Sequence, residues 1–513
     1  MNGEARVSTR SGLLLALVAL GAALRIAYAW PPHKYPADAN ALLGGLQSLR
    51  ILQGHPAALH PRSTKGALES YGHAAAIALS GVGRQATAVA PLLAGIGLIA
   101  VYGLLARSLL GAPLGNVALL FLALPAPAFL FWTYMPLATA EPLLFGTATL
   151  WLADRIRRGE ERLAFPLGLS AGLALWCSVQ SAAFLLPALF WLPWSDRSLA
   201  RNRRFLVWAV CGLAMGSLPR LAHAVAGAPS PHPDSSPGVL LANAAYLMKY
   251  DVPELLASVD PENGPNPPGI LQTSLRTVAL ALHAGGLLTA LAATGAWWTR
   301  GRPRPAAPGV VLLLSVAVLT CFLKLSSSAA DERGLTVAHV LPAYLLAPAG
   351  LALLLAGAWK KSRPATVLAA LALLVFNVAG YALPGGVARR RWEAQAASDE
   401  QLRGYLERRD ITAVVGDYWD VYPFNYLSAL RIRGLPTDPS LDVFRYGETL
   451  PAAARWALTA RSVPRLEQWA SRAGLPISVE QVGDYAVAIP AELPPADAAA
   501  FLQRLRGASV IGP

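Results

Sequence analysis

Carboxylates at the ends of apolar segments are the first residues in this sequence whose type and place suit chemistry. Asp38 is the first acid after the apolar run 11–30, and Glu141 begins the apolar run 142–153. A carboxylate in such a place can act as a general base and take the proton of an attacking hydroxyl or amine. Two plainer roles stay open: Asp38 can cap a helix expected at 39–52, and Glu141 can complement the dipole of its own helix. Glu141 is also a candidate ligand for a divalent metal.

Basic side chains near the ends of other apolar runs form a second group. A cation can neutralise an anionic group such as a phosphate, and a histidine can orient one. Alternatives stay open for three of them: Lys324 can extend its charge to a membrane surface, Arg333 can pair with Asp331 or Glu332, and His339 can be structural. The candidates for holding an anionic group are Lys249, Lys324, Arg333 and His339.

Apolar helices are the elements that must position these residues. The chain has 513 residues, of which 54% are hydrophobic and 14% are charged, and its mean hydropathy is +0.42. A soluble domain carries about 25% charged residues, so this composition and the repeated apolar runs of roughly 17–25 residues indicate a polytopic α-helical membrane protein. Cys177, Cys211 and Cys321 lie within apolar runs and predict no disulfide framework.

One apolar run is too long for a single straight span, and another, which we expect to be one span, contains two prolines. The run 165–194 would extend about 45 Å as one helix, against a hydrocarbon core of about 30 Å. We therefore expect two short helices that break near Ser178-Val179-Gln180. The run 114–132 contains Pro125 and Pro127.

The distribution of basic residues predicts the orientation of the chain. The net charge of +13 does not indicate a nucleic-acid partner, because the basic residues gather in short segments between apolar runs. Such clusters are typical of the cytoplasmic side of a membrane protein. If the chain has about eleven spans and its N-terminus is cytoplasmic, all the strong basic clusters lie on the cytoplasmic side. The clusters are Arg107, Arg155–Arg162, Arg197–Arg204, Arg300–Arg304 and Lys360–Arg363.

This arrangement places two long loops and the tail on the outer side. The loops cover 31–84 and 226–277, and the tail covers 385–513. The tail alternates helix and strand patterns, which predicts a small extracytoplasmic α/β domain with a mixed sheet after a transmembrane domain at 1–384. An alternative stays open at the N-terminus, because Ala27-Tyr28-Ala29 fits the cleavage site of a signal peptide.

The loop 35–81 and three later segments carry a resemblance to a known family. The later segments are 124–146, which contains Glu141, 167–178, and 416–428. The chain resembles the bacterial GT-C membrane glycosyltransferases, the group that includes the protein O-mannosyltransferases and the aminoarabinose transferase. The loop motifs are Asp38-Ala39-Asn40-Ala41, Ile51-Leu52-Gln53-Gly54 and Gly66-Ala67-Leu68-Glu69-Ser70-Tyr71.

The resemblance implies a GT-C type fold and a reaction at the outer face of the bacterial inner membrane. A sugar would pass from a polyprenyl-phosphate donor to a glycan, lipid or protein acceptor, with Asp38 as the base and Glu141 as a second acid or metal ligand. The requirement for a divalent metal stays open. Glu69 belongs to the substrate-binding loop, where we expect it to pair with Arg62 or Lys65.

Tyr418 and Trp419 complete the expected site, because aromatic rings stack on sugars. The core of a small domain would use the same residues, so that alternative stays open.

Three departures from the family pattern motivate a second hypothesis. Asn40 and Ala41 stand where a second acidic pair is expected, and Ala338 stands where the family often has arginine. A catalytically degenerate GT-C-like scaffold or binding subunit is therefore the alternative function. A lipid or sugar transporter is less favoured, because the sequence shows no internal repeat and few ionisable residues within its spans.

Overall fold

The computed structural model divides the chain into two compact units. Unit 1 comprises Met1–Trp30, Thr64–Leu68 and Pro91–Ala388, and unit 2 comprises Pro31–Ser63, Glu69–Ala90 and Arg389–Pro513. The structure describes residues 2–29, 39–60, 65–134, 139–195, 198–225, 243–257, 270–300, 307–325, 339–382, 387–437, 444, 455–472 and 477–489.

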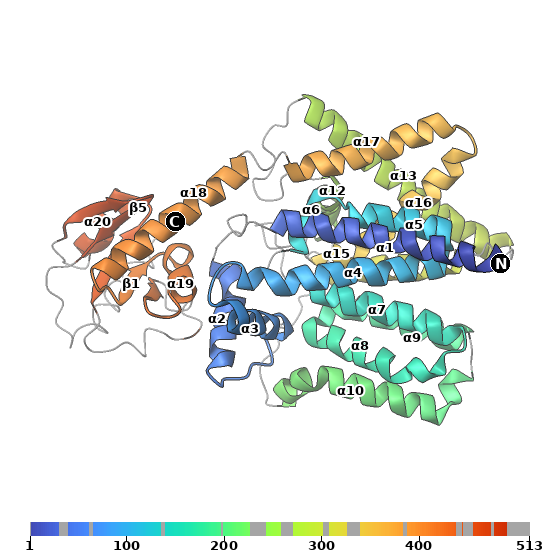
Figure 1. Ribbon diagram of the computed structural model, residues 1–513, viewed down its shortest axis with the longest axis horizontal. Coiled ribbons are helices and arrows are strands. Elements are labelled where there is room, and N and C mark those ends of the chain that lie inside the picture. The colour runs from blue at the N-terminus through green and yellow to red at the C-terminus, as the bar shows by residue number, and fades with distance from the viewer. Residues whose placement is uncertain are drawn as a thin grey trace. The chain divides into compact units, whose positions relative to one another are not determined.

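Unit 1 is built from helices, most of which lie alongside one another (Figure 1). Helix α4 (Ala86–Leu110) begins in unit 2 and continues into unit 1. The other principal helices of unit 1 are α1 (Asn2–Ala29), α5 (Ala112–Ala123), α6 (Pro127–Trp132), α7 (Ala140–Arg157), α8 (Ala164–Cys177), α9 (Ala182–Ser195), α10 (Arg203–Val225), α12 (Val252–Ala257), α13 (Ile270–Arg300), α14 (Ala307–Leu325), α15 (Leu341–Tyr344), α16 (Leu346–Trp359) and α17 (Arg363–Ala382).

The helical content confirms a polytopic membrane protein in outline. Among the described residues, five helices are long and apolar enough to cross a membrane, and further apolar helices are shorter. The expected break near 178–180 is confirmed, because α8 ends at Cys177, a 3-10 turn follows at Val179–Ser181 and α9 then begins. Since other runs are also split into short helices, the count of about eleven spans stays a prediction.

Pro125 and Pro127 divide one apolar run into α5 and α6, and side chains from other helices bind the backbone groups at the break. Arg25 of α1 donates to the carbonyls of Leu122 (3.4 Å) and Ala123 (3.4 Å). In the same region Asn377 of α17 donates to the carbonyl of Leu124 (2.8 Å), and the Ala126 amide donates to the Tyr344 hydroxyl of α15 (2.7 Å). Because a helix break in an apolar environment needs such partners, these contacts stabilise the interruption.

Helices α8 and α10 pack with their backbones in contact (Figure 1). A Cβ atom added at Gly168 would lie 1.9 Å from the Ala209 carbonyl oxygen, and one added at Gly212 would lie 2.3 Å from the Phe165 carbonyl oxygen. Gly172 and Gly216 continue the contact farther along both helices, which therefore run in the same direction. Small residues allow this approach, which is typical of helix pairs in membranes.

Unit 2 contains a five-stranded mixed sheet in the order β2-β1-β3-β5-β4. Strand β1 pairs in parallel with β2 and β3, whereas β5 pairs antiparallel with β3 and β4. The mixed sheet confirms the tail pattern, but β2 was not predicted, because its sequence Arg-Gly-Leu-Pro has no strand periodicity. The strands are β1 (Ala413–Gly416), β2 (Arg433–Pro436), β3 (Trp456–Ala460), β4 (Val479–Val482) and β5 (Tyr485–Ala488).

The core of unit 2 includes a helix from the N-terminal loop. Leu42 and Leu46 of α2 (Ala39–Leu52) belong to the same buried cluster as Tyr422 of α19 (Tyr418–Leu427). The Tyr426 hydroxyl also donates to the Gly83 carbonyl (2.9 Å). The predicted outer loop therefore folds together with the tail. The other helices of this unit are α3 (Leu68–Ser80), α18 (Val387–Arg408), which starts in unit 1, and α20 (Val463–Arg472).

Gly212→Ala tests the contact between α8 and α10. The added methyl group would meet the Phe165 carbonyl, so we expect a loss of about 1–3 kcal/mol in stability, seen as a lower midpoint of thermal unfolding in detergent. Gly357→Ala is the matched control, because a Cβ atom at that helical glycine has no neighbour within 4 Å. Equal midpoints for the two variants would contradict the close packing.

Candidate functional site

Three basic side chains from separate segments of unit 1 interact electrostatically. Lys65 precedes α3, Lys324 lies in the last turn of α14, and His339 precedes α15. Burial lowers the pKa of His339 from 6.5 to about 3, and the charges of Lys65 and Lys324 contribute to the shift. We call these three residues the cationic cluster. Because two cations act on one histidine, the cluster can receive an anionic group.

Lys65 is held by the backbone of the residue that follows it. The Gly66 amide donates to the Cys177 carbonyl at the end of α8 (2.9 Å). A Cβ atom at Gly66 would lie 2.1 Å from the Trp176 carbonyl oxygen, so only glycine permits this approach. The break after Cys177, which the length of the apolar run predicted, thus provides the carbonyl that anchors the Lys65 segment.

His339 is placed by the short helix α15. The Tyr344 hydroxyl accepts from the Ala126 amide, and its ring stacks on Phe129 with centroids 4.2 Å apart. The Tyr102 hydroxyl of α4 donates to the Leu345 carbonyl (3.0 Å). These contacts fix the end of α15, and His339 lies two residues before the start of this four-residue helix.

Lys324 is only 2% exposed although it is charged. It lies at the end of an apolar helix, where the sequence left open that its charge extends to a membrane surface. The side chain is instead buried within the protein, and its charge acts on His339. A buried cation is costly unless charged or polar groups compensate it, so a buried lysine indicates a site with a specific role.

Glu141 also lies in unit 1, in the first turn of α7, and is 5% exposed. The Thr139 hydroxyl donates to the Trp132 carbonyl (2.5 Å) and so fixes the entry to this helix. The position suits either complementing the helix dipole or acting as an acid. Its role in catalysis or metal binding stays a prediction.

Glu69 lies in unit 2, in the first turn of α3, where its Oε1 is 3.6 Å from Nε2 of His73. Both side chains are buried. Burial lowers the pKa of His73 to about 3, and His60 contributes to the shift. A Cβ atom at Gly44 of α2 would lie 3.3 Å from Nδ1 of His73 and 3.5 Å from Nε2 of His60. The two histidines therefore meet beside α2, an arrangement that sequence patterns did not predict.

The remaining candidate site residues are not members of the cationic cluster, or they lie outside the described residues. Lys249 is exposed in a π-helical turn of unit 1 (Leu247–Asp251). In unit 2, Tyr418 is buried in the core, whereas Trp419 is 42% exposed. Asp38 and Arg333 lie outside the described residues, as does Ala338.

Metal binding has no support from the residues that the structure describes. Among them, no group of three or more His, Cys, Asp or Glu side chains could hold a metal ion. The expectation of a divalent metal therefore stays untested.

Lys65 is the residue of the cationic cluster that sequence reasoning did not assign to the site. It was expected, as an alternative to Arg62, to pair with Glu69, and that pairing stays a prediction. The structure adds that the charge of Lys65 acts on His339. The sequence could have indicated Lys65 by its position directly before Gly66, the first residue of a loop motif that carries the family resemblance.

Solved structures of ArnT from Cupriavidus metallidurans are similar to this chain. The apo structure has 12% sequence identity and a TM-score of 0.61, and the match covers 93% of this chain and 98% of that one. The structure bound to undecaprenyl phosphate has 13% identity and a TM-score of 0.58, with the same coverage. No protein-family model matches the sequence, and no curated protein matches it. The chain thus has the fold of these ArnT structures, as the resemblance carried by its loop motifs implied.

Proposed function

We propose that this chain is an integral-membrane glycosyltransferase that transfers a sugar from a polyprenyl-phosphate donor to an acceptor. The cationic cluster carries the proposal, because it provides Lys65, Lys324 and His339 for a phosphate at the end of an apolar helix. A lipid-linked donor requires such a charged site beside an apolar environment. The ArnT structure bound to undecaprenyl phosphate supports the same class of ligand.

The chemistry follows from the change in charge during transfer. When the bond between the anomeric carbon and the phosphate oxygen breaks, negative charge develops on the departing polyprenyl phosphate. Lys65 and Lys324 would stabilise that charge more strongly in the transition state than in the donor. His339 is neutral near pH 7, so it can donate one N–H to a phosphate oxygen without adding to the positive charge around it.

The acceptor must lose a proton as its oxygen or nitrogen attacks the anomeric carbon. Asp38 is the proposed base, and Glu141 is the proposed second acid. The acceptor is a glycan, lipid or protein group. The basic segments between apolar helices support a bacterial inner-membrane location, with the N-terminus cytoplasmic and the tail domain extracytoplasmic.

Substitution of the buried lysine tests the phosphate site. Lys324→Met removes the charge but keeps a long side chain, so the fold should survive. We expect kcat/KM for the lipid-linked donor to fall about 10- to 100-fold, the effect of a charge-assisted hydrogen bond of about 1.5–3 kcal/mol. Lys65→Met should have an effect of similar size. Transfer of radiolabelled sugar from a panel of polyprenyl-phosphate sugars, measured in nanodiscs, provides the rates.

Lys361→Met is the matched control for both lysine variants. Lys361 is exposed in the turn between α16 and α17, so its loss should leave kcat/KM within about twofold. If all three variants keep wild-type rates, the cationic cluster does not bind the donor phosphate.

Asp38→Asn tests the base separately from the phosphate site. An amide cannot accept the proton of the acceptor, so we expect kcat to fall by about 10²–10⁴-fold while binding of the polyprenyl phosphate stays unchanged. Full transfer by this variant would assign the base to another residue, with Glu141→Gln as the next test. A folded wild-type protein that binds the lipid but transfers no sugar from any donor would favour the degenerate scaffold.

The lowered pKa of His339 predicts a pH-dependent stability. Below about pH 6.5 this histidine takes up a proton in the unfolded chain, whereas in the folded chain it does so only near pH 3. The unfolded state therefore gains stability as the pH falls through this range. Between pH 7 and pH 4.5 the unfolding midpoint of His339→Gln should fall less than that of wild type. The control His55→Gln, at an exposed histidine, should follow wild type.

A further inference from the structure

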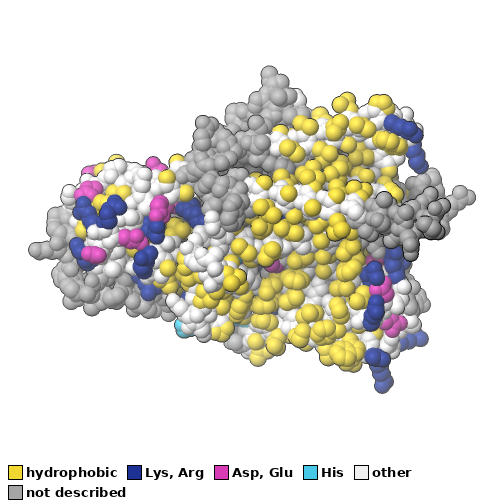
Figure 2. All heavy atoms as spheres, in the orientation of Figure 1, with side chains coloured by type: hydrophobic (Ala, Val, Ile, Leu, Met, Phe, Trp, Pro, Cys, Tyr) yellow, Lys and Arg dark blue, Asp and Glu magenta, His cyan; other side chains and the backbone are white. Residues whose placement is uncertain are grey.

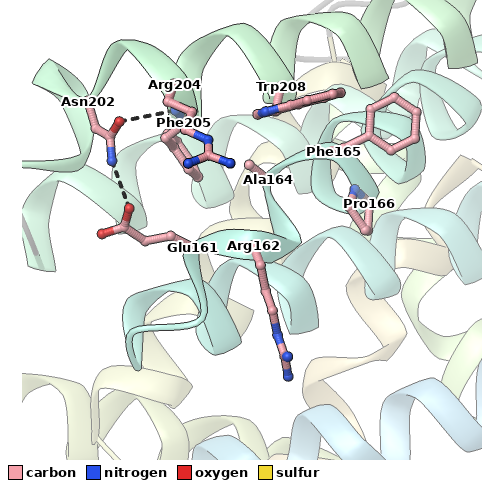
Figure 3. Close-up of a pocket in the computed structure, with 9 residues that line it drawn as sticks. All are labelled: Glu161, Arg162, Ala164, Phe165, Pro166, Asn202, Arg204, Phe205 and Trp208. Carbon is pink, nitrogen blue, oxygen red and sulfur yellow. Dashed lines mark hydrogen bonds between the residues drawn. The ribbon is translucent and has the colours of Figure 1, made fainter.

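A cavity of about 610 Å³ lies where α8 and α10 both begin. Its lining residues do not include any member of the cationic cluster. Its lining combines charged and aromatic side chains from two neighbouring helices and the 3-10 turn η2 (Glu161–Leu163) (Figure 3). Phe165 and Trp208 form an edge-to-face pair with ring centroids 6.1 Å apart. Arg204 extends toward the first residues of α8, whereas Arg162 extends away from α10 (Figure 3).

An internal hydrogen-bond network holds the polar side of this cavity. The Asn202 side chain donates from Nδ2 to Glu161 (2.7 Å) and accepts from the Phe205 amide (3.2 Å) (Figure 3). Glu161 is thus engaged by an amide and offsets one of the two arginine charges. The cavity keeps a net positive charge, and Arg204 precedes Trp208 by four residues on the same helix.

The wall of the cavity continues into an apolar surface on α10. Trp208 is 50% exposed, and Val207, Met215 and Leu218 are exposed on the same side of this helix. The segment Arg203–Val225 is one of the candidate membrane spans, and only 22% of its most apolar stretch is buried within the protein. Figure 2 shows hydrophobic side chains across unit 1, with Lys and Arg side chains gathered at the end of that surface. A ligand in the cavity would therefore have its polar part at Arg204 and its apolar part along α10.

We propose that this cavity binds the phosphodiester headgroup of an anionic phospholipid, with Arg204 as the principal contact and Arg162 adding to the positive charge of the wall. A basic pocket at the end of a lipid-facing helix, bordered by tryptophan, suits an anionic headgroup at the membrane interface. A soluble phosphate compound would use the same cations but would gain nothing from Phe165, Trp208 and the apolar surface of α10. The lipid is therefore the favoured source of the phosphate. This site is separate from the proposed donor site.

Native mass spectrometry of the delipidated protein in detergent tests the proposal. Phosphatidylglycerol and phosphatidylcholine with identical acyl chains are added in competition, and glycerol phosphate is added in a separate arm. Wild type should retain phosphatidylglycerol in preference to phosphatidylcholine and should bind glycerol phosphate much more weakly. Arg204→Gln should lower the affinity for phosphatidylglycerol about fivefold, and the double variant Arg162→Gln/Arg204→Gln more than tenfold.

Arg203→Gln is the matched control, because Arg203 is the exposed neighbour on the same helix but does not line the cavity. It should keep the wild-type preference. An equal loss in Arg203→Gln and Arg204→Gln would mean diffuse attraction to the basic end of α10 and would overturn the site. If wild type shows no preference for phosphatidylglycerol over phosphatidylcholine, that result alone would overturn the proposed site. Binding of glycerol phosphate as tight as that of the lipid would overturn the assignment to a lipid.

Discussion

The interruption between α5 and α6 is the constraint on which unit 1 depends. Pro125 and Pro127 cannot continue a helical hydrogen-bond ladder, and an apolar environment supplies no water to replace it. Arg25, Asn377 and Tyr344 come from three other helices and bind the backbone at the break. Their helices, α1, α17 and α15, are therefore held at one place. A polar residue that looks anomalous within an apolar run, such as Arg25, is explained by this role.

The cationic cluster depends on the same kind of constraint. Tyr344 joins the helix break to α15, and α15 places His339. A second break, after Cys177, leaves a carbonyl that binds the Gly66 amide and so places Lys65. Both interruptions thus convert irregular backbone into fixed positions for side chains. Lys324 lies in the last turn of a regular helix, where its buried charge acts on His339. The proposed donor site follows from where the helices break.

Much of the architecture was predictable because its signals are local. Apolar length predicted the break between α8 and α9, and alternating patterns predicted the mixed sheet of the tail. The joining of α2 to the core of unit 2 was not predictable, since the partners Leu46 and Tyr426 are separated by most of the chain and each suits a helix without the other. The effect of Lys65 on His339 was not predicted for a similar reason, because the two residues are far apart in the sequence. Strand β2 lacks any periodic pattern, and its parallel pairing with β1 is a tertiary contact that no local pattern indicates.

The most direct test of this account is an experimental structure of the protein with a bound polyprenyl phosphate, determined by cryo-electron microscopy in nanodiscs. The account predicts the phosphate within hydrogen-bond distance of the Lys65 and Lys324 ammonium groups, with a ring nitrogen of His339 directed at a phosphate oxygen. A well-resolved lipid phosphate held elsewhere, with these three side chains uninvolved, would contradict the central claim that the cationic cluster is the donor site.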